Sequence, residues 1–373
     1  MSRRNQGGSI RKVERKDGPR WMVRFDVVDP ATGKRRETSR TFHTEPDARA
    51  FQAERAMDCL RGGDGGHNPI AGQARLEVVW ADFERLKARQ VRPKTWSGYQ
   101  GVWKQLIAPR WAQTPMADID AVDVADWLDS LTVGVWMKRS TLKVLRLLAE
   151  HAVRTRLIRV NVMRDVPTPR LPPRDGHRYL SYPEVVRLAE TFGPGSLGHH
   201  LTLFLGLTGL RWSEAVGLRW QDVDLSRRRV YVRRSAVDVG GKIHFGEPKT
   251  AAGRRSVPLA RVVVELLTDR HAVRGDSDLV FTSPLGSVLR ASNFRQRLTT
   301  PPWNDALITA GVAPLRIHDL RHSYAALSRA AGADLTMISK CMGHASTLVT
   351  TGIYADLFDD ELTAVADRLD ALR

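Results

Sequence analysis

Cysteine and long apolar runs are both scarce in this chain. Only Cys59 and Cys341 occur among 373 residues, which excludes a disulfide framework and an all-cysteine zinc site and favours a reducing compartment. No apolar run approaches the roughly 18–20 residues that span a bilayer, and the first residues lack the apolar stretch of a signal peptide. We therefore expect a soluble, cytoplasmic protein.

Several motifs that identify enzyme classes are also missing. The sequence contains no G-x-x-x-x-G-K-[ST], no G-x-S-x-G and no H-E-x-x-H, so a P-loop ATPase, an α/β-hydrolase and a zincin have no support. His318 and His322 stand at i and i+4, a spacing that can hold a metal on one helix face. Asp319 replaces the glutamate base, however, and no third ligand lies at a suitable spacing. We expect neither a metal nor another cofactor.

Positive charge is what the chain has in excess. Fifty-eight Lys and Arg residues against 41 Asp and Glu residues give a formal net charge of +17. A polyanionic partner commonly accompanies such an excess, and nucleic acid is the first candidate. The length predicts two or three domains, and 42% hydrophobic residues suffice to give each a core.

Residues 1–62 are expected to form a small DNA-binding domain. Alternating apolar residues predict strands at 9–13, 21–28 and 35–42. Thr44 as N-cap, with Asp47 in the capping-box position, begins a helix. Residues 1–40 contain 12 Lys and Arg and five Asp and Glu, a net +7. We interpret the sheet as a DNA contact, because basic strands are narrow enough to enter a groove.

Residues 74–164 are expected to form a four-helix domain, after a Gly-rich linker at 62–66. Apolar residues at helical spacing mark four faces: 76, 79, 80, 83 and 86; 102, 103, 106 and 107; 122, 124, 127, 128 and 131; and 142, 144, 145, 148 and 152. Six tryptophans, at 80, 96, 103, 111, 127 and 136, are interpreted as core. Four prolines in 165–177 predict an extended linker.

The last segment, 178–373, mixes helices with short strands and predicts an α+β domain. Strands are expected at 229–233, 242–245 and 254–257. Helices are expected at 184–191, 201–207, 259–271, 292–298, 302–310, 318–331, 334–341, 346–354 and 359–371. The fold class is therefore multidomain and mainly α with small β-sheets. The final helix carries an apolar stripe, and its burial on its own domain or on a neighbouring copy is left open.

Several residues in this last segment stand in an ordered set. They are Arg211 in Thr-Gly-Leu-Arg-x-x-Glu, Lys249 in Glu-Pro-Lys-Thr, His318-x-x-Arg321, Gly343-His344, and Tyr354 ten residues after His344. Together they resemble the tyrosine recombinase (phage integrase) family over essentially all of 178–373. The middle bundle is similar to the family's core-binding domain, and residues 9–60 are similar to its arm-type DNA-binding domain.

The residue types suit phosphoryl transfer to a protein nucleophile. Tyr354 supplies a phenolic oxygen, and its attack on DNA gives a 3′-phosphotyrosine and a free 5′-hydroxyl. The bond energy is retained, which agrees with the missing ATP-binding loop. Arg211 and Arg321 can bind the non-bridging oxygens bidentately, which lysine cannot do.

The remaining site residues have assisting roles. Lys249 would protonate the leaving 5′-oxygen, and Lys242, beside a Gly-Gly turn, is its rival. His318 would handle the tyrosine proton or hold the phosphate, and His344 would hydrogen-bond a non-bridging oxygen. Glu214 lies one turn from Arg211 and either orients it or is a surface charge.

We expect a site-specific recombinase that integrates or excises a phage or another mobile element. The resemblance implies double-stranded DNA with core-type and arm-type sites, a homo-tetramer on that DNA, accessory DNA-bending or directionality proteins, and the cytoplasm of a bacterial host. One alternative is a relaxing enzyme of the type IB topoisomerase kind, which needs no arm-binding unit. The other is a non-catalytic DNA-binding regulator, against which the intact set of Tyr354, both arginines and His318 argues.

Overall fold

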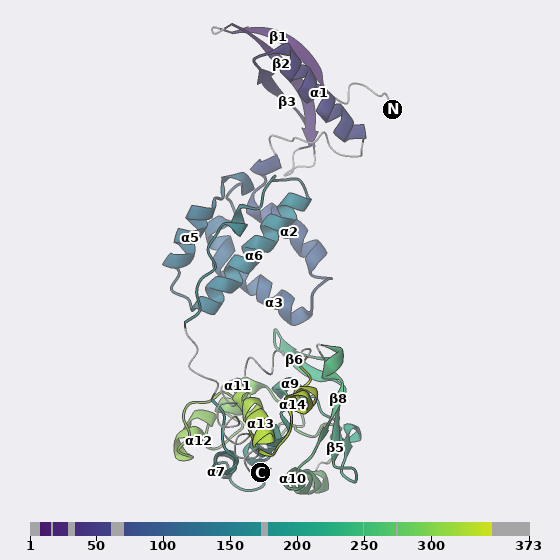
Figure 1. Cartoon of the computed structure of the whole chain (residues 1–373), viewed down its shortest axis with the longest axis vertical. Coiled ribbons are helices and arrows are strands. Elements are labelled where there is room, and N and C mark those ends of the chain that lie inside the picture. The colour runs from purple at the N-terminus through teal and green to yellow at the C-terminus, as the bar shows by residue number, and fades with distance from the viewer. Residues whose placement is uncertain are drawn as a thin grey trace, which may run out of the picture. The chain divides into compact units, whose positions relative to one another are not determined.

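The computed structural model describes residues 8–15, 18–28, 34–60, 71–172, 178–248, 250–273 and 275–344. The chain divides into two compact units, Met1–Pro172 and Pro173–Arg373. We refer to three described parts: the N-terminal segment (8–60), the bundle (71–172) and the C-terminal unit (178–344) (Figure 1). Five expectations fall outside the described residues: the linker at 62–66, Lys249, Tyr354, and the helices at 346–354 and 359–371.

The N-terminal segment is an antiparallel sheet with one helix. Its elements are β1 (Ser9–Arg15), β2 (Gly18–Val28), β3 (Arg35–Phe42) and α1 (Glu45–Leu60), and the strand order is β1-β2-β3. Val23, Phe25 and Phe51 form its core with α1. The Thr44 hydroxyl donates to the Asp47 carboxylate at 2.6 Å and accepts from the Asp47 backbone N–H at 3.3 Å. The expected strands and helix start are confirmed.

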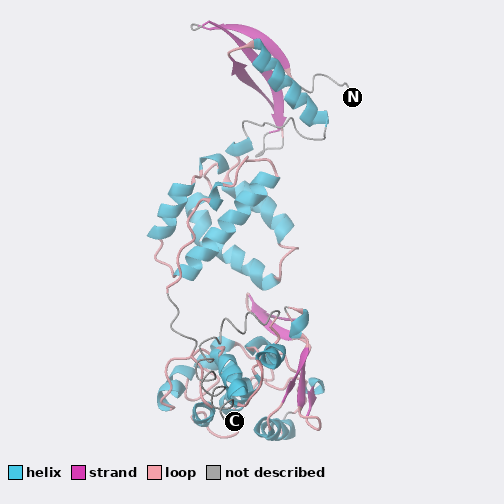
Figure 2. Cartoon of the chain, viewed as in Figure 1, coloured by secondary structure: helices cyan, strands magenta, loops and turns pink. Residues whose placement is uncertain are grey.

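The bundle contains the four expected helices, and its regular structure is helical throughout (Figure 2). The helices are α2 (Leu76–Lys87), α3 (Pro93–Val102), α5 (Ala121–Ser130) and α6 (Val135–Arg154). A π-helical turn, Trp103–Ile107, continues α3 into α4 (Ala108–Trp111), and short 3₁₀ turns lie at Ala71–Gln73, Met116–Asp118 and Val162–Arg164. Leu76, Phe83, Leu128 and Leu145 are among its fully buried core residues.

Three side chains expected in the bundle core are exposed. Leu86 at the end of α2 is 46% exposed, Val122 in the first turn of α5 is 69% exposed, and Trp136 in the first turn of α6 is 62% exposed. Each lies in a terminal turn, where a helix has fewer neighbours to cover it. The other five tryptophans do lie in or against the core.

The first part of the expected linker is fixed to α6. The Arg146 guanidinium donates to the Val166 carbonyl at 2.7 Å, and Arg139 donates to the Pro169 carbonyl at 2.9 Å. Val166 is buried in the bundle core. Residues 165–172 thus belong to the bundle rather than to a free linker.

The C-terminal unit is built around α8, whose apolar residues are buried on nearly all sides. Its helices are α7 (Tyr182–Glu190), α8 (Leu197–Thr208), α9 (Trp212–Ala215), α10 (Arg261–Ala272), α11 (Ala291–Gln296), α12 (Trp303–Thr309), α13 (Asp319–Ala330) and α14 (Leu335–Met342). Neighbouring helices α7 and α13 both pack on α8. The expected capping box of Ser181 and Glu184 begins α7.

The strands of this unit form two small antiparallel sheets. One has the order β4 (Val223–Asp224), β5 (Arg229–Val232) and β8 (Arg255–Pro258), and the other is a hairpin of β6 (Ser235–Val239) and β7 (Lys242–Gly246). Strand β6 was not expected from the sequence. The turn residues Gly240 and Gly241 both have positive φ, +58° and +82°, as a tight hairpin requires. The expected fold class, mainly helical with small sheets, is confirmed.

Among the helices of the described ranges, none combines the length and the apolar character that a bilayer span requires.

Candidate active site

The site lies where the carboxyl ends of two helices meet the amino ends of two others. Gly209 ends α8 and Gly343 ends α14, with φ of +64° and +67°. A Cβ atom at Gly209 would lie 2.3 Å from the Tyr324 ring, and one at Gly343 would lie 2.8 Å from the Ala252 carbonyl oxygen. Glycine is therefore required at both helix ends by conformation and by space.

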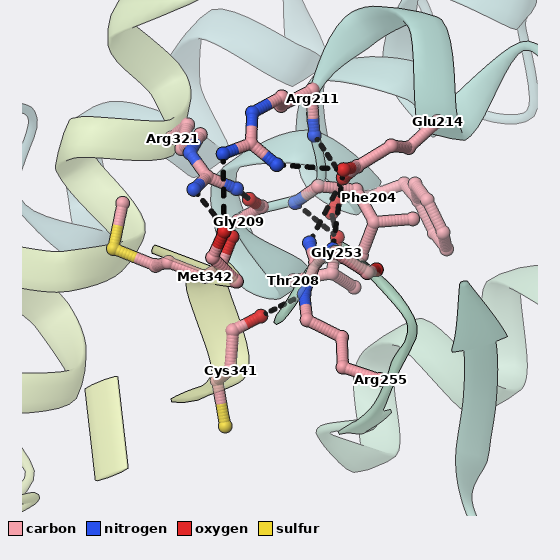
Figure 3. Close-up of polar contacts among 12 residues, drawn as sticks. Phe204, Thr208, Gly209, Arg211, Glu214, Gly253, Arg255, Arg321, Cys341 and Met342 are labelled. Atoms are coloured by element: carbon pink, nitrogen blue, oxygen red, sulfur yellow. Dashed lines mark hydrogen bonds and ion pairs between the residues drawn. The ribbon is translucent and has the colours of Figure 1, made fainter. Parts of the chain in front are cut away.

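Arg211 is the N-cap residue of α9 and is about a third exposed (36%). Its Nη1 lies 2.8 Å from Glu214 Oε1, and its Nη2 donates to the Gly343 carbonyl oxygen at 3.3 Å. Its backbone N–H donates to Glu214 Oε2 at 2.9 Å (Figure 3). The guanidinium is thus oriented from one side and accessible from another.

Arg321, in the first turn of α13, is only 3% exposed. Its Nη1 donates to the Gly209 carbonyl oxygen and its Nη2 to the Met342 carbonyl oxygen (Figure 3). The carboxyl end of a helix carries partial negative charge, so both helix ends favour the cation. The fold therefore brings together Arg211, Arg321 and the Gly343-His344 turn, which are far apart in the sequence.

The two predicted histidines lie beside these arginines and have lowered pKa values. His318 precedes α13, and its ring meets that of His322 edge to face at 5.6 Å. Partial desolvation, followed by the charge of Arg321, lowers the pKa of His318. Burial, followed by the charges of Arg321 and Arg211, lowers the pKa of His344 to about 4. At neutral pH His344 is therefore an uncharged hydrogen-bonding group.

His318 and His322 are adjacent, as their spacing predicted. Across the ranges that the structure describes, no group of three or more His, Cys, Asp or Glu side chains is arranged to hold a metal ion.

Glu214 is a buried carboxylate, 3% exposed, and not a surface charge. It lies between Arg211 and Arg255, and Arg255 Nη1 and Nη2 lie 3.1 and 2.9 Å from its two oxygens. Burial alone would raise the pKa of Glu214. The hydrogen bonds and charge of Arg255, followed by those of Arg211, outweigh burial, and the pKa of Glu214 lies below its ordinary value. Glu214 is therefore ionised at neutral pH.

Sequence reasoning missed Arg255. Its side chain is 5% exposed, and its Nε also donates to the Cys341 carbonyl oxygen. A signal was present, because Arg255 and Val257 alternate in β8 and Val257 is fully buried. An arginine on the inward face of a strand needs a buried partner.

Of the two candidate general acids, Lys242 lies within the described residues and Lys249 does not. Lys242, at the start of β7, is exposed. Lys249 lies outside the described residues, whereas the residues on either side of it are described. A Cβ atom at Gly253 would lie 2.5 Å from Pro248 Cβ, and the Ala252 carbonyl oxygen lies close to Gly343. Tyr354 also lies outside the described residues, so its distance to the arginines stays a prediction.

The chain is similar to known proteins over most of its length. Residues 182–361 match the family model described as the phage integrase family. The chain is 33% identical to the tyrosine recombinase XerD of Mycobacterium tuberculosis over 269 residues, 65% of this chain and 79% of that one. It is 25% identical to the putative prophage phiRv2 integrase of the same species over 366 residues, 92% of this chain and 90% of that one.

Solved structures give the same fold. The Tn1549 transposon integrase in complex with transposon right-end DNA aligns with a TM-score of 0.66 at 20% identity, over 80% of this chain and all (100%) of that one. The lambda integrase tetramer bound to a Holliday junction aligns with a TM-score of 0.58 at 17% identity, over 92% of this chain and 94% of that one.

Fold and similarity together define a DNA strand-exchange enzyme. The chain belongs to the phage integrase family of tyrosine recombinases. It is a site-specific recombinase of the integrase type.

Proposed function

We propose that this recombinase cleaves DNA by attack of Tyr354 on a backbone phosphate, which gives a 3′-phosphotyrosine and a free 5′-hydroxyl. Attack of a 5′-hydroxyl on that intermediate rejoins the strand and releases the tyrosine. The chemistry conserves the phosphodiester energy and needs neither ATP nor a metal. Its biological outcome is integration or excision of a phage or another mobile element.

The observation that carries this proposal is the pair of guanidiniums at the site. Arg321 is held by two carbonyls and Arg211 by Glu214 and Gly343, so both are fixed before a phosphate arrives. Prearranged donors stabilise the charge that develops on the phosphate oxygens. Neutral His344 hydrogen-bonds a non-bridging oxygen, His318 handles the tyrosine proton or holds the phosphate, and Lys249 protonates the leaving oxygen.

The N-terminal segment binds arm-type sites through the open face of its sheet. Residues directly opposite in neighbouring strands share a face, so Arg24 lies between Ser9 and Ser39, and Arg11 lies opposite Met22. Val23, Phe25 and Val27 point to the other face, which α1 covers. The open face thus offers exposed arginines and small hydroxyls, a composition suited to a DNA groove.

The bundle binds core-type DNA through the outer face of α6. A groove there has a volume of about 530 Å³, and its lining includes Trp136, Arg139, Lys143 and Arg164. The exposed indole and the basic side chains form an electropositive surface of the kind that holds a phosphate backbone.

The working assembly is a homo-tetramer on DNA in the cytoplasm of a bacterial host, with accessory DNA-bending or directionality proteins. Two similarities support it: the lambda integrase was solved as a tetramer on a Holliday junction, and the Tn1549 integrase was solved with DNA. The final helix expected at 359–371 lies outside the described residues, and its docking in cis or in trans is a further prediction.

Covalent capture tests this function. The full chain is incubated with a pool of nicked duplexes of random sequence, in EDTA and without ATP, and the DNA that stays joined to denatured protein is sequenced. Cleavage close to the nick releases a short fragment that diffuses away. Its 5′-hydroxyl is then lost for rejoining, so the 3′-phosphotyrosine accumulates. We expect adducts with one enriched core sequence.

Tyr354→Phe is the control, because it removes the phenolic oxygen and almost nothing else. It should bind the captured duplex about as well as the wild type and form no adduct. An adduct from this variant, or no adduct from the wild type, would refute the proposed nucleophile. Exchange of strands between two captured duplexes separates a recombinase from a relaxing enzyme.

A further inference from the structure

Arg255 joins three segments at the site: α9, the end of α14 and the turn before β8. Its guanidinium meets both oxygens of Glu214 from α9, the Cys341 carbonyl oxygen near the end of α14, and the Gly253 carbonyl oxygen at 3.1 Å (Figure 3). The side chain is 5% exposed. Arg255 and Arg211 share the Glu214 carboxylate, so Arg255 can act on Arg211 through Glu214.

Glu214 is shared equally between the two arginines. Oε1 accepts from Arg211 Nη1 at 2.8 Å and from Arg255 Nη1 at 3.1 Å. Oε2 accepts from the Arg211 backbone N–H at 2.9 Å and from Arg255 Nη2 at 2.9 Å. The carboxylate therefore holds Arg211 by its main chain and side chain while its charge is paired with Arg255.

A count of charges shows why this matters. Arg211 and Glu214 alone would form a neutral ion pair, and a neutral pair attracts a phosphate weakly. With Arg255 the three groups carry a net charge of about +1, because two cations face one buried anion. Arg211 is the more exposed of the two cations, so the uncompensated charge lies on the side that a phosphate can reach.

We propose that Arg255 is a positioning residue in this recombinase. Arg255 neutralises the buried carboxylate of Glu214, so that Glu214 can orient Arg211 without cancelling the positive charge of Arg211. The inference rests on the proposed role of Arg211 as a phosphate ligand. It adds a residue that touches neither DNA nor nucleophile and yet sets how strongly the clamp acts.

The first test compares Arg255→Met with Arg219→Met in the full chain, using the nicked duplex obtained by covalent capture. Arg219 is a matched control, because it also pairs with a buried carboxylate of the same unit, Asp222 at 2.9 Å. We expect Arg255→Met to slow single-turnover adduct formation about 10- to 100-fold with little change in duplex affinity, a loss typical of residues that orient a ligand. Arg219→Met should lower the melting temperature and leave the rate unchanged.

The second test is a double-mutant cycle with Glu214→Gln. If Arg255 acts by neutralising Glu214, removing the carboxylate charge makes Arg255 dispensable. Arg255→Met should then slow adduct formation less than about threefold in the Glu214→Gln background. An equal loss in both backgrounds would overturn the proposal. If Arg255→Met alone fails to fold, the comparison of Glu214→Gln with the double variant still tests the proposal. The double variant should fold, because it has no buried carboxylate left without a partner.

Arg255→Lys adds a conservative variant, since it keeps the charge and loses the two-pronged contact. We expect it to retain most of the adduct rate, within about fivefold of the wild type. Loss equal to that of Arg255→Met would show that charge is not what Arg255 supplies, and would overturn the proposal.

The pH profile gives a readout that a packing role would not move. Among the described residues, Arg255 and Arg211 are the charged groups that lower the pKa of Glu214, so without Arg255 the carboxyl protonates more easily and no longer cancels the charge of Arg211. The rate of Arg255→Met relative to the wild type should rise as the pH falls from about 8 to about 5.5. Arg255 also lowers the pKa of His344, so the same ratio is measured in the Glu214→Gln background. Any slope that remains there is attributed to His344, and an equally steep slope in both backgrounds would contradict the proposal.

Wild-type adduct formation in the same assays separates the two ideas. If the wild type forms no adduct, the proposed function fails. If the wild type forms adducts and Arg255→Met forms them at the same rate, only the role of Arg255 fails.

Discussion

The bundle and the C-terminal unit fill their interiors differently. In the bundle, Trp80 stacks on Trp103 with ring centroids 4.6 Å apart and an interplanar angle of 1°, and on Trp96 at 5.5 Å. In the C-terminal unit, charged side chains lie inside: Glu214, Arg255, Arg321 and Asp222. Aromatic stacking stabilises a domain directly, whereas buried ion pairs contribute little net stability because their desolvation cost is high.

This difference separates two purposes within one chain. The bundle interior serves to keep helices together, so its residues answer to volume and shape. The buried charges of the C-terminal unit hold guanidiniums in fixed positions, which under the proposed function prearranges those of the site for the substrate. Substitutions in the two interiors should therefore affect different measurements, and four experiments test whether they do.

The largest effect is expected from the two clamp arginines. Arg211→Lys and Arg321→Lys should each slow adduct formation about 10²- to 10³-fold, because an ammonium cannot bind two phosphate oxygens as a planar fork does. They should differ in stability. Arg321→Lys also leaves the Gly209 or Met342 carbonyl without its donor, at a cost of about 1–3 kcal/mol. Rates and melting curves of both variants check this, and a wild-type rate in either would refute the clamp.

Next is Lys249→Ala, which should slow cleavage of ordinary DNA by about 10²-fold. A duplex whose bridging 5′-oxygen is replaced by sulfur should largely restore the rate, because a thiolate leaves without a proton. Lys242→Ala is the matched comparison. If sulfur rescues Lys242→Ala and not Lys249→Ala, the general acid is Lys242 and the assignment of Lys249 is wrong.

In the bundle, Phe83→Ala should cost about 3–5 kcal/mol of unfolding free energy, since Phe83 is 1% exposed and contacts the rings of Trp80, Trp96 and His151. Hydrogen exchange should show the loss in residues 71–172. At saturating duplex, the cleavage rate should stay within about twofold of the wild type. A much larger loss of rate would show that the two interiors are not separate in purpose.

The smallest effect concerns acid stability of the C-terminal unit. Burial, followed by the charge of Arg270, lowers the pKa of His200 to about 4 from an ordinary 6.5. The unfolded chain therefore binds a proton below about pH 6.5 that the folded unit excludes, and stability falls as the pH drops from 6.5 towards 4. The expected loss is about 2–3 kcal/mol. His200→Leu should flatten the decline in hydrogen-exchange protection, and an unchanged slope would contradict the prediction.

Local features were the predictable part of this fold. The cap of Thr44 with Asp47 and the box of Ser181 with Glu184 each join residues three positions apart, and both predictions are confirmed. Strand β6 was missed, since Ser235-Ala-Val-Asp-Val shows its pairing only with β7 in place. Trp136 was predicted to lie in the core and is exposed, because composition does not reveal that the described part of the chain leaves this indole in the first turn of α6 uncovered.

The sequence by itself determined the family of this protein. An ordered set of Arg211, Lys249, His318, Arg321, His344 and Tyr354 identifies the family, and excess positive charge points to DNA. Only the tertiary structure decided how the arginines are held. Arg211 meets Gly343 across 132 residues, Arg321 meets Gly209 across 112, and Arg255 meets Glu214 across 41. Periodicity and capping act over a turn or two, so contacts at such separations exist only once helices from the whole unit have packed around α8.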